Sequence, residues 1–508
     1  MAILKAPDTT ASRNDFLRSE RIAGGILPKV LNSFDMVVIV VAIILWIPNS
    51  AVVAGAGPAA FIYWGLGFIT FLIPGAIVTG QLGLMFPGEG SIYVWTTKAF
   101  GRFTGFIAGF CAWWPSILVM IAAGDVIVSL IQHLGTLFHT PLLQEPSTQG
   151  YVIMITLVLS YVLSILRFRV TQNLANALFL AYGCAILLIG LAGILWLVTG
   201  NTASTNLSLQ SGNWSLNGSN FTFYGTVILA LLGIEVPLNM GVEIKDTRSI
   251  TRYLLWGSII VMIAYLITTF AVVAVPLKDQ GNPAGITEAV QMGFGSAGTI
   301  LSAIVDVLLI GFFVFVCAVN NYSFARLLFV SGLDRRLPAI ISKVSSKRVP
   351  WVAVLTQTII GISFTAIIFV LAPLSFKSAK SAELSTVVFN ILEASITVVW
   401  CISMSILFVD VIIIRRRYRD LFQRIRIAPD WVFYLCSIIG TIASLFGITV
   451  NFTSPWTNSL SLTTGQWDIW IASITAASLL VAVVGFYIGQ HTLKSDLRDE
   501  DIIAVVTN

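Results

Sequence analysis

Long apolar runs separated by short polar connections dominate this chain. A helix needs about 20 mostly apolar residues to cross the hydrocarbon core of a bilayer. Twelve runs meet this length and predict an all-α, polytopic membrane protein with both termini on one side. The predicted spans are 34–56, 60–86, 103–131, 149–167, 172–199, 222–243, 253–276, 297–324, 351–373, 384–413, 431–450 and 468–489.

The composition supports a membrane protein. Of the 508 residues, 57% are hydrophobic and 10% are charged, whereas soluble domains carry roughly 25% charged residues. The first 20 residues lack an apolar core followed by a small-residue cleavage site, so we expect no signal peptide.

The basic residues predict the orientation of the spans. On the face shared with the termini lie 26 of the 29 lysines and arginines, and the other face has only Lys278, Lys377 and Lys380. Because positive residues stay on the inner side, both termini are predicted to be cytoplasmic, in a multi-pass protein of the cell membrane. This bias also accounts for the net charge of +5, and a nucleic-acid partner is not indicated.

Cysteine and histidine usage indicates no metal centre, cofactor or catalytic site. All five cysteines lie within apolar runs rather than in outer loops or at the short spacing of a zinc site. The three histidines are scattered, so we expect a protein that is not an enzyme. Segment 201–220 holds four N-glycosylation sequons, which indicate either a glycosylated outer loop or only a polar spacer.

Two of the predicted spans carry a polar break in the middle. Span one contains Pro48-Asn49-Ser50, and span six contains Gly233, Glu235 and Pro237. Interrupted helices at corresponding places in two halves of a chain are typical of inverted-repeat carriers, which bind ligands at the breaks. The alternative is that each proline only kinks its helix.

Three motifs beside these spans carry a family resemblance. They are FPGEGSIYVWTTKAFG at 86–101, GIEVPLNMGVEIKD at 233–246 and FARLLFVSGLDRRLP at 324–338. Together they resemble the amino acid–polyamine–organocation permeases. The resemblance implies a five-plus-five inverted repeat with broken helices 1 and 6, two extra C-terminal helices, and transport by alternating access.

The resemblance and the span pattern together predict the organisation of the chain. Two repeats and two extra helices are expected between short cytoplasmic ends. The predicted parts are an N-terminal segment 1–33, repeat one at 34–199, an outer loop 200–221, repeat two at 222–413, a basic cytoplasmic loop 414–430, two helices at 431–489 and a tail 490–508.

The chain also departs from the family pattern. Pro48-Asn49-Ser50 replaces the usual Gly-x-Gly, whose bare amides hold a substrate carboxylate, and proline has no amide donor. Residues 229–232 include no aromatic gate, and span five has no lysine for proton coupling. We therefore expect a ligand outside the usual α-amino acid mode, such as an ω-amino acid or amine.

Polar residues within the spans are the candidates for function. Carboxylates inside a membrane are costly and indicate functional sites. Alternatively, Glu235 could only hydrogen-bond the broken helix, and the other three could face the outer vestibule or one another. The coupling or gating candidates are Tyr93, Asp125, Glu235, Asp306 and Glu393. The expected substrate contacts are Pro48, Asn49, Ser50, Ala51, Leu232, Gly233, Ile234 and Glu235. The expected cytoplasmic gate comprises Glu243, Lys245, Arg326 and Asp334.

These features predict a secondary-active permease for a small amino acid or related amine, coupled to H⁺ or Na⁺. A polyamine or other organocation carrier is the near alternative, because no internal lysine or arginine competes for the buried carboxylates. A sensor or channel on the same scaffold is the more distant alternative.

Overall fold

The computed structural model describes residues 17–166, 168–209, 212–218, 220–277, 285–375, 381–453 and 463–492. Lys278, Lys377 and Lys380 lie outside these ranges, as do residues 1–16 and 493–508 of the predicted terminal segments. The described residues form helices joined by turns, with two isolated β-bridges and no strand. The prediction of an all-α protein is confirmed.

Ten helical segments in the described ranges are long and apolar enough to cross a membrane, and a bent pair at 33–56 brings the number to eleven. They are Ala59–Met85, Arg102–Leu137, Pro146–Ile165, Arg169–Val198, Arg248–Ala274, Gly295–Leu333, Trp351–Leu374, Asn390–Arg417, Asp430–Val450 and Thr464–Gly489. Each overlaps a predicted span. The predicted sixth span, 222–243, is instead a short helix followed by turns.

The labelled elements divide these segments further. The N-terminal half comprises α1 (Arg18–Ile26), α2 (Ser33–Ile44), α3 (Pro48–Val53), α4 (Ala59–Gly67), α5 (Ile73–Met85), α6 (Ser91–Phe100), α7 (Arg102–Trp113), α8 (Pro115–Leu137), α9 (Pro146–Ile165) and α10 (Phe168–Val198). The second half comprises α11 (Thr222–Ala230), α12 (Arg248–Ala274), α13 (Gly285–Gly293), α14 (Gly298–Leu333), α15 (Trp351–Thr365), α16 (Ala372–Ser375), α17 (Ser381–Arg417), α18 (Arg419–Ile425), α19 (Asp430–Val450) and α20 (Thr464–Thr492).

The first break separates α2 from α3 by a bend of 44°. It lies at residues 45–47, three residues before the centre expected from the sequence, because Pro48 begins α3 rather than occupying the break. Proline suits the first helical position, where its missing N–H would have no partner in the helix. Asn49 and Ser50 therefore lie in the first turn of the second half-helix.

Two tyrosine hydroxyls bind the backbone groups that this break exposes. Tyr265 accepts from Trp46 N at 3.0 Å and donates to Ile44 O at 2.7 Å. Tyr182 accepts from Ile47 N at 3.4 Å and donates to Leu45 O at 2.8 Å. These backbone groups thus have hydrogen-bond partners inside the protein, as a low-dielectric environment requires.

The second break follows α11. Residues 231–235 form turns, and short 3₁₀ segments follow at Val236–Asn239 and Gly241–Glu243. Gly233 has φ +106°, which a residue with a side chain rarely adopts, and a Cβ there would lie 2.5 Å from Ile43 Cγ2 of α2. The unwound backbone predicted around residues 233–237 is present.

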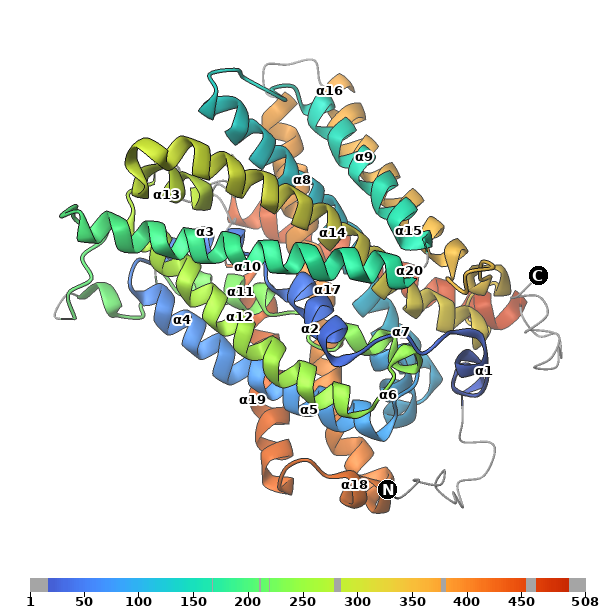
Figure 1. Cartoon of the computed structure of the whole chain (residues 1–508). Helices are drawn as coiled ribbons and strands as arrows, with labels where there is room; N and C mark the ends of the chain where they lie inside the picture. The colour runs from blue at the N-terminus through green and yellow to red at the C-terminus, as the bar shows by residue number, and fades with distance from the viewer. Residues whose placement is uncertain are drawn as a thin grey trace.

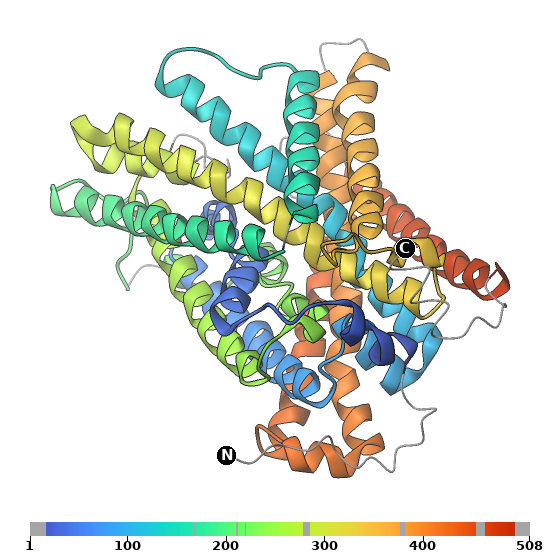
Figure 2. The ribbon, with the colours of Figure 1, turned by 45° about the vertical axis from the view of Figure 1, so that its right-hand side comes forward.

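The basic end of the bundle is the end where Lys98, Arg326 and Arg417 lie. The Arg417 guanidinium donates to Lys98 O at 3.0 Å, which joins the end of α17 to the end of α6. Helix α18 projects beyond this end, and α16 lies at the opposite end of the bundle (Figures 1 and 2). The two breaks lie between these ends.

Candidate functional site

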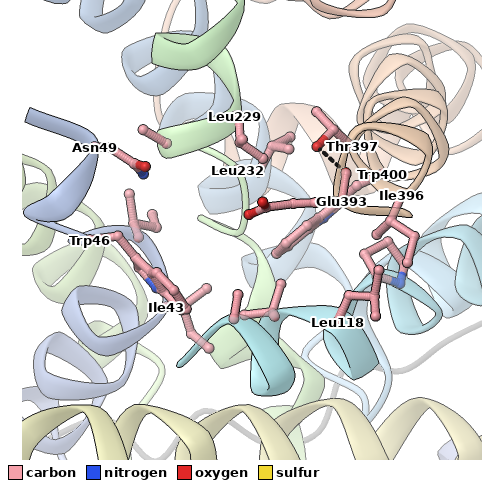
Figure 3. Close-up of a pocket in the computed structure, with 15 residues that line it drawn as sticks. Ile43, Trp46, Asn49, Leu118, Leu229, Leu232, Glu393, Ile396, Thr397 and Trp400 are labelled. Carbon is pink, nitrogen blue, oxygen red and sulfur yellow. Dashed lines mark hydrogen bonds between the residues drawn. The ribbon is translucent and has the colours of Figure 1, made fainter. Parts of the chain in front are cut away.

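A cavity of about 70 Å³ lies between the two breaks. Since one water needs roughly 10–15 Å³ by this kind of measure, the cavity has room for several waters or a small solute. Helices α2, α3, α8, α11 and α17 surround it (Figure 3). Its lining residues are Ile43, Ile44, Trp46, Asn49, Pro115, Leu118, Val119, Ala122, Leu229, Ala230, Leu232, Glu393, Ile396, Thr397 and Trp400.

Glu393 is the one charged side chain among the lining residues that the structure describes. Its carboxylate extends from α17 into the cavity, and the Asn49 side chain lies across from it on α3 (Figure 3). Thr397 donates to the Glu393 backbone carbonyl at 2.8 Å, and so stays one turn away without engaging the carboxylate. The cavity thus presents one carboxyl group and one side-chain amide within a mostly apolar wall.

A second carboxylate acts on this site from outside the cavity lining. Asp125 of α8 interacts electrostatically with Glu393. Two like charges close together in a low dielectric are unfavourable. A cation bound at Glu393 would relieve this repulsion.

Glu235 lies behind the cavity wall. Its side chain is buried, and Oε1 accepts a long hydrogen bond, 3.5 Å, from Trp400 Nε1. Its Oε2 has no hydrogen-bond partner among the described residues. Because the Trp400 indole lines the cavity, Glu235 is connected to the site through that ring.

The predicted substrate contacts occupy different places around the cavity. Asn49 and Leu232 line it. The residues next to them in the sequence do not line it: Pro48, Ala51, Gly233 and Ile234. Ser50 is turned away, with Oγ 2.6 Å from Thr268 Oγ1 of α12. The contact role of these residues stays a prediction.

At the basic end, Glu243 and Arg326 form a buried ion pair. Arg326 donates to Glu243 Oε1 through Nη2 at 2.8 Å and through Nε at 3.0 Å. The Lys245 side chain is exposed, although its backbone N–H donates to Leu31 O at 2.9 Å. Two members of the predicted gate therefore bind each other directly.

Asp334, another predicted gate residue, binds the N-terminal helix α1. Its carboxylate accepts from Ser19 N at 2.7 Å and from Ser19 Oγ at 2.9 Å. It also accepts a hydrogen bond from Tyr93. Burial raises the pKa of Asp334, and the hydrogen bonds from Ser19 and Tyr93 oppose the rise. Tyr93 and Asp334 thus join α6 and α14 to α1, away from the cavity.

Asp306 lies apart from the cavity, near the start of α14. Its Oδ2 is 2.7 Å from His133 Nδ1 of α8, and His133 is also 3.2 Å from Thr287 Oγ1 of α13. His133 was not among the residues predicted from the sequence to have a role. Its place near a helix end did not indicate that it would meet a carboxylate.

Three further residues were missed. Trp46 and Trp400 form aromatic walls of the cavity, and no local signal distinguishes them from packing residues. Asp410 of α17 is fully buried, with Oδ2 accepting from Thr96 Oγ1 at 2.6 Å. Its position inside the predicted span 384–413 was the signal that could have identified it.

Comparisons with known proteins find similarity to membrane transporters, the class of protein predicted from the sequence. Residues 31–484 match the family model described as amino acid permease. An uncharacterized transporter of Legionella pneumophila is 26% identical, with 67% of this chain and 73% of that protein covered. The polyamine transporter RMV1 of Arabidopsis thaliana is also 26% identical, with 72% and 69% covered.

Two other matches are lower in coverage or in identity. The probable agmatine/putrescine antiporter AguD of Lactococcus lactis is 24% identical over 52% of this chain, and the match spans 56% of that protein. A crystal structure of the Eremococcus coleocola manganese transporter has a TM-score of 0.57 at 14% identity, with 93% of this chain and 94% of that chain covered. At this identity the structure shows a shared fold alone.

Proposed function

The chain belongs to the amino acid permease family, and from this premise we propose that it carries a small amino acid or related amine by secondary-active alternating access. The proposed site is the cavity between the two breaks. The basic end is proposed to face the cytoplasm, with both termini on that side. The five-plus-five inverted repeat, the twelve-span topology and the cell membrane as its location are part of the same proposal.

The observation that carries the substrate class is Glu393. An ionised carboxylate in a mostly apolar cavity recognises a protonated amine through a charge-assisted hydrogen bond. The described lining residues include no lysine or arginine that would neutralise Glu393 in place of the substrate amine. Trp46 and Trp400 add aromatic faces, to which cations are attracted.

The first break favours recognition through the amine rather than through an α-carboxylate. Backbone amides at a helix start usually bind anions, but the Asn49 and Ser50 amides already donate to Trp46 O and Ile47 O, both at 2.9 Å. Pro48 has no amide hydrogen. The Asn49 side chain is the remaining polar group of this turn in the cavity lining.

A polyamine or other organocation is the second candidate substrate. The electrostatic interaction of Asp125 with Glu393 supports it, because two carboxylates that act on one site suit a ligand with more than one positive charge. The names of the Arabidopsis and Lactococcus relatives agree with this class. Asp125 is outside the cavity lining, so a long ligand would have to extend toward it.

Uptake by proteoliposomes tests both candidates. The purified protein is offered labelled amino acids, ω-amino acids, monoamines and polyamines, with and without pH and sodium gradients. We expect saturable uptake of an amine-bearing solute, and each gradient tests one coupling ion. Uptake or binding of none of these solutes would refute the proposed function.

A further inference from the structure

We propose that Glu89 is a proton-binding residue that links proton uptake to closure of the basic end. This inference rests on the proposed alternating-access function. It concerns the Arg326 cluster, which we define as Glu89, Glu243 and Arg326. Glu89 was not among the residues predicted from the sequence to have a role, although it lies within the motif FPGEG.

Three separate elements contribute to the Arg326 cluster. Glu89 lies in the connection between α5 and α6, Glu243 in the 3₁₀ segment after the second break, and Arg326 in α14. Arg326 binds Glu243 in two hydrogen bonds, but its Nε is 3.6 Å from Glu89 Oε1, beyond hydrogen-bond distance. Arg326 therefore pairs less closely with Glu89 than with Glu243.

Glu89 is also incompletely hydrogen-bonded. Its Oε2 accepts from Val242 N at 3.2 Å, while its Oε1 has no hydrogen-bond partner among the described residues. The side chain is 1% exposed. A buried carboxylate oxygen without a hydrogen bond is costly when ionised, and a proton on it removes that cost.

The net charge of the Arg326 cluster also indicates that Glu89 binds a proton. Two carboxylates and one guanidinium, all buried, carry one excess negative charge unless a proton is bound. Burial and the Glu243 carboxylate raise the pKa of Glu89 well above its usual value, against the opposing effects of Arg326 and the Val242 amide. Burial also raises the pKa of Glu243, and its close ion pair with Arg326 opposes that rise. Because Glu89 lies farther from Arg326 and its Oε1 has no hydrogen-bond partner among the described residues, we assign the proton to Glu89.

The other groups near the Arg326 cluster do not change its net charge. Glu20 of α1 packs near Gly88 and is paired with Lys98 of α6 at 3.0 Å. Tyr322 of α14 accepts from Arg326 through its backbone carbonyl at 3.0 Å. In these contacts Lys98 pairs with Glu20, and Glu89 meets Arg326 at ion-pair distance.

Closure and proton binding are then linked. Opening the cavity toward the basic end separates the three elements and admits water, which returns Glu89 toward its ordinary pKa. The closed state binds the proton more tightly, so closure is favoured at low pH and weakens as pH rises through the closed-state pKa. Within that window the closure equilibrium changes by up to roughly tenfold per pH unit.

Hydrogen exchange of the full-length purified protein tests this inference without any substrate. Protection factors, corrected for the intrinsic pH dependence of exchange, are measured for segments 86–91 and 236–246 from pH 5 to pH 8. We expect wild-type protection to fall at least about tenfold as pH rises. Glu89→Gln, which imitates the protonated side chain, should stay protected throughout.

Glu20→Gln serves as the matched control, because it removes a nearby carboxyl from another pair, and it should retain the wild-type pH dependence. Wild-type protection that is constant with pH would refute the inference even if Glu89→Gln failed to fold. An unchanged pH dependence in Glu89→Gln would also refute it. Proteoliposome uptake decides the proposed function separately, because the exchange measurement needs no transport.

Discussion

Glu393 and Asn49 face each other across the cavity, from α17 and from the first turn of α3 (Figure 3). These two residues belong to helices that lie far apart in the chain, one in each predicted repeat. A solute between them would contact both halves of the molecule. This arrangement is suited to coupling ligand binding to movement of one half against the other.

Glu393→Gln should weaken substrate binding while leaving the fold intact. The change removes the anionic partner of the proposed amine and keeps the side-chain shape. A charge-assisted hydrogen bond contributes about 1.5–3 kcal/mol, so we expect the dissociation constant to rise roughly tenfold to a hundredfold. Binding to purified protein measures this, with the exposed loop variant Glu145→Gln as control. Unchanged affinity in Glu393→Gln would exclude Glu393 as the amine-binding residue.

Tyr265→Phe should destabilise the break between α2 and α3. The hydroxyl binds Trp46 N and Ile44 O, and it also donates to Ala230 O of α11 at 3.2 Å. Its loss leaves buried backbone groups unpaired, at a cost of about 1–3 kcal/mol. Thermal unfolding in detergent should show a lower midpoint. Tyr151→Phe, at an exposed position of α9, should match the wild type; equal midpoints for both variants would contradict the prediction.

The sequence predicted the second break better than the first. Gly233 and Pro237 both mark the second break, and the structure unwinds there because glycine tolerates the positive φ that the turn needs. At the first break, Pro48 was placed in the unwound segment, whereas its fixed φ and missing N–H make it the first residue of α3. The two cavity residues predicted as substrate contacts, Asn49 and Leu232, adjoin these breaks.

Other parts of the site could not be predicted from local sequence. At the first break, the hydroxyls of Tyr182 and Tyr265 bind backbone groups more than 130 residues away in the chain, and no spacing rule connects them. The pairing of Arg326 with Glu243 likewise depends on how α14 packs against the second break. Membrane helices are similarly apolar on many faces, so periodicity does not identify which side chains meet.

Gly233→Ala should impair both stability and transport. Alanine disfavours φ +106°, and its Cβ would lie 2.5 Å from Ile43 Cγ2, so the turn or α2 must move. The unfolding midpoint and the transport rate should both fall. Gly183→Ala is a matched control in α10, where a Cβ meets nothing within 4 Å and alanine is the better helix former. Equal behaviour of the two variants would show that the second break tolerates rearrangement.

Glu235→Gln should keep substrate binding but flatten the dependence of transport on pH. The variant preserves the shape next to Trp400 and removes the group that can exchange a proton. Because Glu235 contacts the Trp400 indole but is not itself among the described lining residues, affinity at one pH should change less than in Glu393→Gln. Uptake by proteoliposomes, measured from pH 5 to pH 8, decides this. A wild-type pH profile in Glu235→Gln would mean that the carboxyl only supports the broken helix.

Arg326→Gln should destabilise the protein more at high pH than at low pH. The change leaves Glu89 and Glu243 buried without a cation, and breaking a buried ion pair costs about 3–5 kcal/mol. Arg326 now lowers the pKa of both carboxyls, so its removal raises both and favours their protonated forms. Low pH supplies those protons, and the lost stability should therefore grow as pH rises from 5 to 8. Adding Glu243→Gln to the variant removes one buried charge and should recover part of the unfolding midpoint at pH 8. A loss that is equal at both pH values, with no recovery in the double variant, would show that the guanidinium stabilises the basic end by packing rather than by charge.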